Sequence, residues 1–181
     1  MSSLSVYHVS SPDLPNKVLT HFDDITATLA EQGVRFDRWQ ATAKLQPGAS
    51  DEELVAAYQG PIDQLMTARG YLGVQVTSVS SEQSPHAEPH AGLFEEQHFD
   101  EDLVRFFVAG RGQFNLHIDD YVYAVLCEKN DLILVPAGTR HWFDGGERPH
   151  FVAIGLFSNA LEPRARITPG GIAGHFPRLE D

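Results

Sequence analysis

Apolar and polar residues alternate in short runs through the second half of the chain. Five such runs follow one another between residues 103 and 157, separated by turn-forming sequences such as Asp-Asp, Lys-Asn-Asp and Gly-Gly. Short strands at this spacing predict a mainly β fold, either a sandwich or a barrel. The runs are LVRFFVAG, GQFNLHI, YVYAVLCE, DLILVPAG and HFVAIGLF.

The first half of the chain mixes helical and strand patterns. Residues 22–33 have the apolar spacing of a short amphipathic helix. Residues 50–71 have the same spacing and begin with Ser50 and Glu53, which are placed as in a capping box. Because the Gly60-Pro61 pair interrupts this segment, we expect two short helices rather than one long helix. Further strands are predicted at residues 4–9, 34–41 and 72–79.

Composition and charge narrow the class of protein. The chain has 181 residues, 42% of them hydrophobic and 21% charged, which is typical of one globular domain. Its net charge of −12 disfavours binding to nucleic acid, so a small organic substrate is the expected partner. Cys127 is the only cysteine, which excludes an intrachain disulfide and a zinc site built from several cysteines. The N-terminal residues do not resemble a signal peptide, and no apolar run is long enough to span a membrane, so we expect a cytoplasmic protein.

One motif in the second half indicates a metal-binding barrel. Residues 136–141, PAGTRH, have the spacing Pro-x-Gly-x-x-His. This motif resembles the second signature of the cupin superfamily, whose small β-barrels hold a metal in their mouths. The resemblance implies that the turn reverses the chain and directs His141 into the barrel.

Longer segments resemble one family within this superfamily. GVRFDRWQA, VRFFVAGRGQFNLHI, VLCEKNDLILVPAGTRHWFD and FPRL are similar to bacterial acireductone dioxygenases of methionine salvage. The resemblance implies one cupin domain over residues 1–181, in which residues 1–90 pack on the barrel, 91–158 carry the metal site and 159–181 form a tail. It also implies one Fe(II) or Ni(II), held by three His and one Glu, that chelates a 1,2-dihydroxy-3-keto enediol. The iron form then yields formate and a 2-keto acid with O₂, and the nickel form also releases carbon monoxide.

The first metal motif of that family is altered in this chain. The family has His-x-His-x-x-x-Glu followed by Val-Arg-Phe-Phe, and the second part is intact here at residues 104–107. Counting back from it without a gap places Gln97, Phe99 and Leu103 at the positions of three metal ligands. Only His141 matches, so we expect a divergent member whose metal site is largely lost.

A shifted register would supply another set of ligands. His98 and Asp100, together with His141, would form a two-histidine, one-carboxylate set that suits Fe(II) better than Ni(II). A slip of one residue, however, sends every side chain of a strand to the opposite face. A β-bulge would be needed to bring His98 and Asp100 into the barrel.

Other residues complete the expected pocket. Arg105 lies on an otherwise apolar strand and needs an anionic partner, so we expect it to act with His141 in catalysis. Phe143, Gln97 and Phe99 are the expected substrate contacts. Gly155 stands where the family usually has arginine, which suggests a relaxed or redirected function.

Two alternatives stay open at the level of sequence. One is a metal-free protein that uses the barrel to bind a small molecule or a partner subunit. The other is a metal-independent enzyme in which His141 or His98 is the acid–base catalyst and Arg105 holds an anion. We expect a monomer or a small homo-oligomer with neither nucleic acid nor membrane as a partner.

Overall fold

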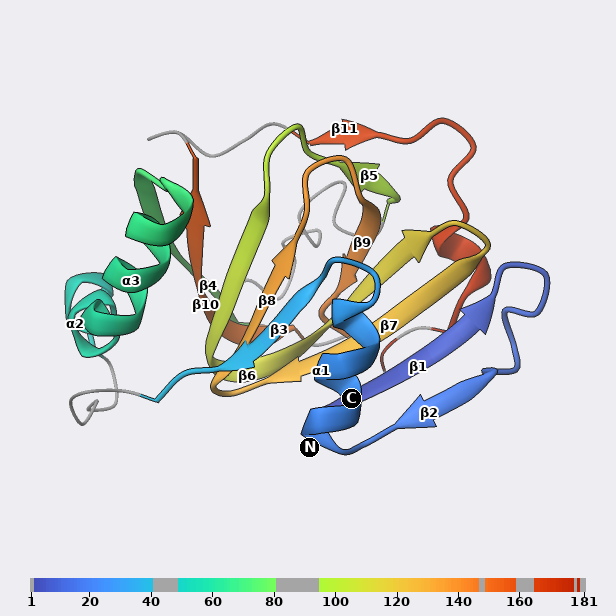
Figure 1. Ribbon diagram of the computed structural model, residues 1–181, viewed down its shortest axis with the longest axis horizontal. Helices are drawn as coiled ribbons and strands as arrows, with labels where there is room; N and C mark the ends of the chain where they lie inside the picture. Colours follow the sequence, from blue (N-terminus) through green and yellow to red (C-terminus); the bar gives the residue numbers. More distant parts are fainter. Residues whose placement is uncertain are drawn as a thin grey trace.

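Two antiparallel sheets, joined by one long shared strand, make up most of the molecule (Figure 1). The computed structural model describes residues 2–40, 49–80, 95–146, 149–158, 165–177 and 179. The strands are β1 Ser3–His8, β2 Lys17–Leu19, β3 Arg35–Arg38, β4 Gly73–Ser80, β5 Gln97–His98, β6 Leu103–Ile118, β7 Tyr121–Glu128, β8 Asp131–Val135, β9 Arg140–Asp144, β10 His150–Phe157 and β11 Arg166–Ile167. The prediction of a mainly β chain is confirmed.

Strand β6 joins the two sheets because its halves have different neighbours. Its first half pairs with β8 on one side and β10 on the other, and β3 and β4 extend that sheet. Its second half pairs with β7 and β9, in the order β11-β5-β9-β6-β7-β1-β2. The pairing of β10 with β6 shifts register between Val152 and Ala153. Near this point Gly110 has φ +74°, and a Cβ there would lie 2.0 Å from the carbonyl oxygen of His150, so the close approach requires glycine.

Alternation along β6 separates two apolar cores. Leu103 and Phe107 face one core, together with Leu116, Ile133 and Val135 from the second half of the chain. Val104 and Phe106, which alternate with them, face a second core that helices α2 and α3 cover. Its buried members include Leu54, Tyr58, Ile62, Leu65, Val104, Phe106, Leu132 and Leu134.

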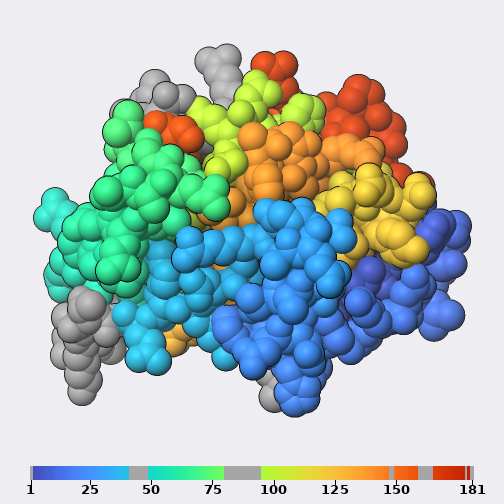
Figure 2. All heavy atoms as spheres, in the orientation of Figure 1, coloured from blue at the N-terminus to red at the C-terminus, as the bar shows by residue number. Residues whose placement is uncertain are grey.

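The helices form where the pattern predicts them. They are α1 Phe22–Ala30, α2 Asp51–Ala57 and α3 Gln59–Arg69, with a short 3₁₀ helix, η1, at Ala173–His175. The Ser50 side chain accepts a hydrogen bond from the Glu53 amide at 3.2 Å, and Gly70 ends α3 with φ +74°. The break between α2 and α3 falls at Tyr58, so Gly60 and Pro61 lie in the first turn of α3. In Figure 2, segments from the first half of the chain cover most of the face in view.

Short strands are where the sequence pattern and the structure differ. The strands β2, β5 and β11 have only two or three residues each, too few to show a periodic pattern. The first two predicted runs of the second half join into the single strand β6. Residues 80–97, a polar stretch with two prolines that is typical of a loop, lie mostly outside the described residues. None of the described helices is both long and apolar enough to cross a membrane.

Candidate functional site

His141 lies on β9, between β5 and β6. Its partners in the two ladders are Gln97 and Leu116, and only 2% of its surface is exposed. The turn that precedes it has Gly138 at φ +82°, and the Gly138 amide donates to the Phe99 carbonyl at 2.8 Å. The Pro-x-Gly turn therefore fixes the path of the chain into β9 and buries the imidazole.

The environment of His141 fixes its tautomer. Nδ1 lies 2.9 Å from the Thr139 carbonyl oxygen, and because a carbonyl only accepts, Nδ1 is the protonated nitrogen. Burial is the largest effect on the pKa of His141 and lowers it. The positive charge of Arg105 also lowers this pKa, against the opposing effects of the Thr139 hydrogen bond and the Glu96 charge. The imidazole is therefore neutral near pH 7 and carries a free lone pair on Nε2, which suits either a metal ligand or a general base.

The three residues at the expected ligand positions, Gln97, Phe99 and Leu103, differ in their relation to His141. Gln97 is directly opposite His141 in the ladder and is 7% exposed. The Phe99 ring lies 5.6 Å from the imidazole, centroid to centroid, at an interplanar angle of 32°. Leu103 is buried in the first core, and Phe99 packs against that core. The unshifted count from residues 104–107 therefore places an amide and a phenyl ring next to His141, and a leucine in the core against which that ring packs.

His98 and Asp100 have other neighbours. His98 is opposite Arg166 of β11, and because successive side chains alternate, it points away from the face that Gln97 shares with His141. Asp100 is 64% exposed at its side chain and forms an ion pair with Arg166 at 2.7 Å. Within the described part of the chain, no group of three or more His, Cys, Asp or Glu residues could hold a metal ion. The shifted set stays a prediction.

Arg105 lies opposite Gly155 of β10 and Ile133 of β8. Its Nη1 donates to the Val104 carbonyl at 3.1 Å, and its guanidinium carbon lies 5.4 Å from the centre of the Phe157 ring. A Cβ on Gly155 would lie 2.5 Å from Nη1, so the absence of a side chain at residue 155 makes room for the guanidinium. This places a positive charge near enough to lower the pKa of His141.

Phe143 lies two residues after His141 on β9 and belongs to an aromatic cluster. Its ring centre is 4.9 Å from Phe114 and 5.2 Å from Phe151. A Cβ on Gly112 would lie 2.2 Å from the Phe143 ring, so glycine is required there. Phe143 is 7% exposed, and its described ring contacts are with other aromatic rings of the core. Its contact with a substrate stays a prediction.

Two carboxylates near the site were not singled out from the sequence. Asp102 belongs to an acidic run that composition alone assigns to the solvated surface. Instead it accepts hydrogen bonds from the Tyr71 hydroxyl and the Ala137 amide, both at 3.0 Å, and so holds the turn that leads to His141. Glu96, only 2% exposed, accepts a hydrogen bond from the Ile172 amide at 3.1 Å. Sequence spacing carries no sign of either role, because the partners are far away along the chain.

Comparison with known proteins gives consistent matches over most of the chain. The model of the ARD/ARD' family matches residues 6–164. An acireductone dioxygenase from Pseudomonas fluorescens (strain Pf0-1) is 69% identical over 100% of both chains, and one from Pseudomonas syringae pv. syringae (strain B728a) is 66% identical over the same span.

One solved structure resembles the whole fold. It is an acireductone dioxygenase from Bacillus anthracis with a cadmium ion in its active centre. It has a TM-score of 0.75 and 28% identity, covering 94% of this chain and 95% of that one. This likeness confirms the predicted cupin-type fold.

Proposed function

The chain belongs to the ARD/ARD' family, and we propose that it is an oxidoreductase that cleaves an acireductone, a 1,2-dihydroxy-3-keto compound of methionine salvage, with O₂. The full-length identity to acireductone dioxygenases supports the substrate class. The observation that carries the proposal is His141, a buried, neutral imidazole in the barrel with its tautomer fixed by Thr139.

The described residues supply acid–base and electrostatic chemistry. The lone pair on Nε2 of His141 accepts a proton from an enediol hydroxyl, which leaves an enediolate. Arg105 provides a positive charge that stabilises this anion in an apolar barrel, where charge interactions are stronger than in water. The bond between the two hydroxylated carbons then breaks with consumption of one O₂, to give formate and a 2-keto acid.

The residues around His141 do not fit the metal centre that the family implies. Gln97, Phe99 and Leu103 stand where two histidines and one glutamate would be needed. An amide oxygen is a weak ligand for Fe(II) or Ni(II), and phenyl and isobutyl groups are no ligands at all. We therefore assign the proton transfer to His141 and route no step through a metal.

A second function is favoured by Gln97, His141 and Arg105 together. One amide, one imidazole and one guanidinium among apolar side chains could bind a small oxygenated molecule without converting it. In this case the chain would be a metal-free binding protein of the family. The expected cytoplasmic location, the absence of nucleic-acid and membrane partners, and the monomeric or small homo-oligomeric state stay predictions.

Oxygen uptake tests the proposal. Protein from cells grown with added iron or nickel is analysed for metal and mixed with an acireductone, while O₂ and substrate absorbance are followed. We expect consumption faster than in protein-free buffer, and a drop of about 10²–10⁴-fold when His141 is replaced by Gln. If both the iron-grown and the nickel-grown protein consume O₂ only at the rate of protein-free buffer, the proposal is overturned. Binding of the acireductone without O₂ uptake would instead support the second function.

A further inference from the structure

Strand β5 has only Gln97 and His98, yet it holds the residue directly opposite His141. Its other edge is covered by β11, where Ile167 pairs with Gln97. The Thr168 amide donates to the Glu96 carbonyl at 2.8 Å and extends this pairing. Figure 1 shows β11 beside β5 and the chain continuing from it toward β1 and β7. We call residues 166–176 the C-terminal strap.

The side chain of Glu96 joins the strap to the central strands. Its Oε2 accepts the Ile172 amide at 3.1 Å, and its Oε1 lies 3.0 Å from His117 Nδ1 and 3.8 Å from Arg140 Nε. The Glu96 side chain is 1% exposed, and a buried carboxylate needs such partners to offset its lost hydration. Its partners therefore come from the strap, from β6 and from β9.

The partners of Glu96 flank the site on the opposite face of the sheet. His117 and Arg140 face each other across β6 and β9, one position along from the pair Leu116–His141. Because neighbouring residues of a strand point to opposite faces, Glu96 holds the outer face of the same strands whose inner face carries Gln97 and His141.

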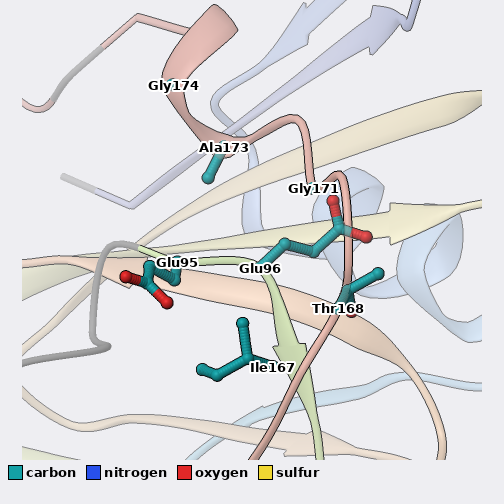
Figure 3. A pocket seen from close by; sticks show the side chains of 7 residues that line it. All are labelled: Glu95, Glu96, Ile167, Thr168, Gly171, Ala173 and Gly174. Atoms are coloured by element: carbon teal, nitrogen blue, oxygen red, sulfur yellow. The ribbon is translucent and has the colours of Figure 1, made fainter.

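The backbone of the C-terminal strap passes close to the side chain of Glu96. In Figure 3 the Glu96 side chain extends toward the loop that carries Gly171. A Cβ on Gly171 would lie 2.7 Å from the Glu96 Cβ, so this approach needs glycine. Beyond it, Phe176 packs on Trp142 and Tyr7, with ring centres 5.7 and 5.8 Å away. The strap is thus attached at both ends, beside β5 and beside the neighbour of His141.

We infer that Glu96 is a positioning residue that, through the C-terminal strap, holds Gln97 against His141 and so sets the shape of the substrate pocket. The inference rests on the proposed function for its substrate, but the position of the strap and of His141 can be measured without turnover. A two-residue strand has too few ladder bonds of its own to keep a fixed place, so its neighbours must supply the order.

Two pairs of variants test the inference. Glu96→Gln removes the buried charge, and Glu95→Gln is its control because Glu95 is the exposed preceding residue. Gly171→Ala pushes the strap away from Glu96, and Gly174→Ala is its control because nothing lies within 4 Å of a Cβ there. Since Gly171 is exposed, its variant keeps the test open if Glu96→Gln does not fold.

Hydrogen exchange measures the strap, and the imidazole ¹⁵N signals of His141 measure the site. We expect Glu96→Gln and Gly171→Ala to speed amide exchange of Thr168 and Ile172 about tenfold and to shift the His141 signals, with both controls unchanged. If the enzyme turns over, KM for the acireductone should rise more than kcat falls.

Two outcomes would overturn the inference. One is exchange at the wild-type rate in both test variants, because Glu96 would then not hold the strap. The other is a released strap with unchanged His141 signals, because the strap would then be structural only. A failure of the proposed function is distinct from both, since it leaves the exchange and ¹⁵N results unaffected.

Discussion

At the scale of single residues, His141 and Arg105 are the proposed catalytic groups, and their surroundings decide their protonation and position. His141 could be picked out from the Pro-x-Gly-x-x-His spacing alone. Its protonation state could not, since it depends on burial and on the Thr139 carbonyl. The place of Arg105 depends in the same way on Gly155, a residue of a strand that lies far along the chain.

Because the pKa of His141 is lowered by folding, we expect the folded chain to become less stable at acid pH. The folded chain binds this proton less readily than the unfolded chain, whose histidine titrates near 6.5. Stability therefore falls as the pH drops below about 6.5, by at most about 1.4 kcal/mol per pH unit from this residue, until the folded pKa is passed. His141→Gln should lack this part of the dependence. Urea unfolding of both proteins at several pH values between 5 and 8 measures it, and parallel curves would contradict the assignment.

Gly155→Ala should move Arg105 without unfolding the protein. The added Cβ would lie 2.5 Å from Nη1, which is the end of a flexible side chain, so the guanidinium can shift at a cost below about 1 kcal/mol. We expect a rise in KM for the acireductone by about 3–30-fold, as for a weakened charge-assisted contact. Gly60→Ala, a helical position with no atom within 4 Å of its Cβ, is the control. An unchanged KM would remove Arg105 from the binding site.

At the scale of elements, strand register decides which side chains meet. The intact residues 104–107 allowed the register to be counted back to Gln97, and the ladder places Gln97 opposite His141. Strands such as β7 could be predicted, and β6 could be predicted as two runs, since alternation is visible within the sequence itself. The strands β5 and β11 could not, because each exists only through pairing with residues distant in the chain.

The turn before β9 depends on Asp102. Its carboxylate accepts from the Ala137 amide and the Tyr71 hydroxyl, and the latter bond adds to burial in raising the pKa of Tyr71. Asp102→Ala should lower the free energy of unfolding by about 1–3 kcal/mol, because it leaves two donors without their acceptor. Urea denaturation measures the loss. Asp100→Ala, at an exposed position, should change stability by less than about 0.5 kcal/mol.

At the scale of the whole molecule, two sheets that share β6 form a barrel around an apolar core, and helices α2 and α3 cover one side of it. This scaffold has an amide at residue 97 and apolar side chains at residues 99 and 103, the positions at which the family resemblance implies metal ligands. The family resemblance therefore predicts the fold, whereas the chemistry of the site depends on the side chains at residues 97, 99 and 103.

Restoring the family's ligand motif should turn this scaffold into a metal protein. The triple variant Q97H/F99H/L103E would restore the two imidazoles and the carboxylate that the family resemblance implies, with residue 97 opposite His141. Without metal, a carboxylate at the buried position 103 should destabilise the fold by several kcal/mol. With Ni(II) at about a thousand times its Kd, metal binding should raise the free energy of unfolding by about 4 kcal/mol.

Metal analysis and thermal unfolding with and without a chelator measure both effects. The wild-type chain should contain far less than one metal ion per molecule and unfold at the same temperature in either condition, whereas the triple variant should hold one ion and lose stability when chelated. The single change F99H is the control, since two imidazoles alone make a much weaker site than four ligands. Stoichiometric metal in the wild-type chain, lost on His98→Ala, would instead establish the shifted register.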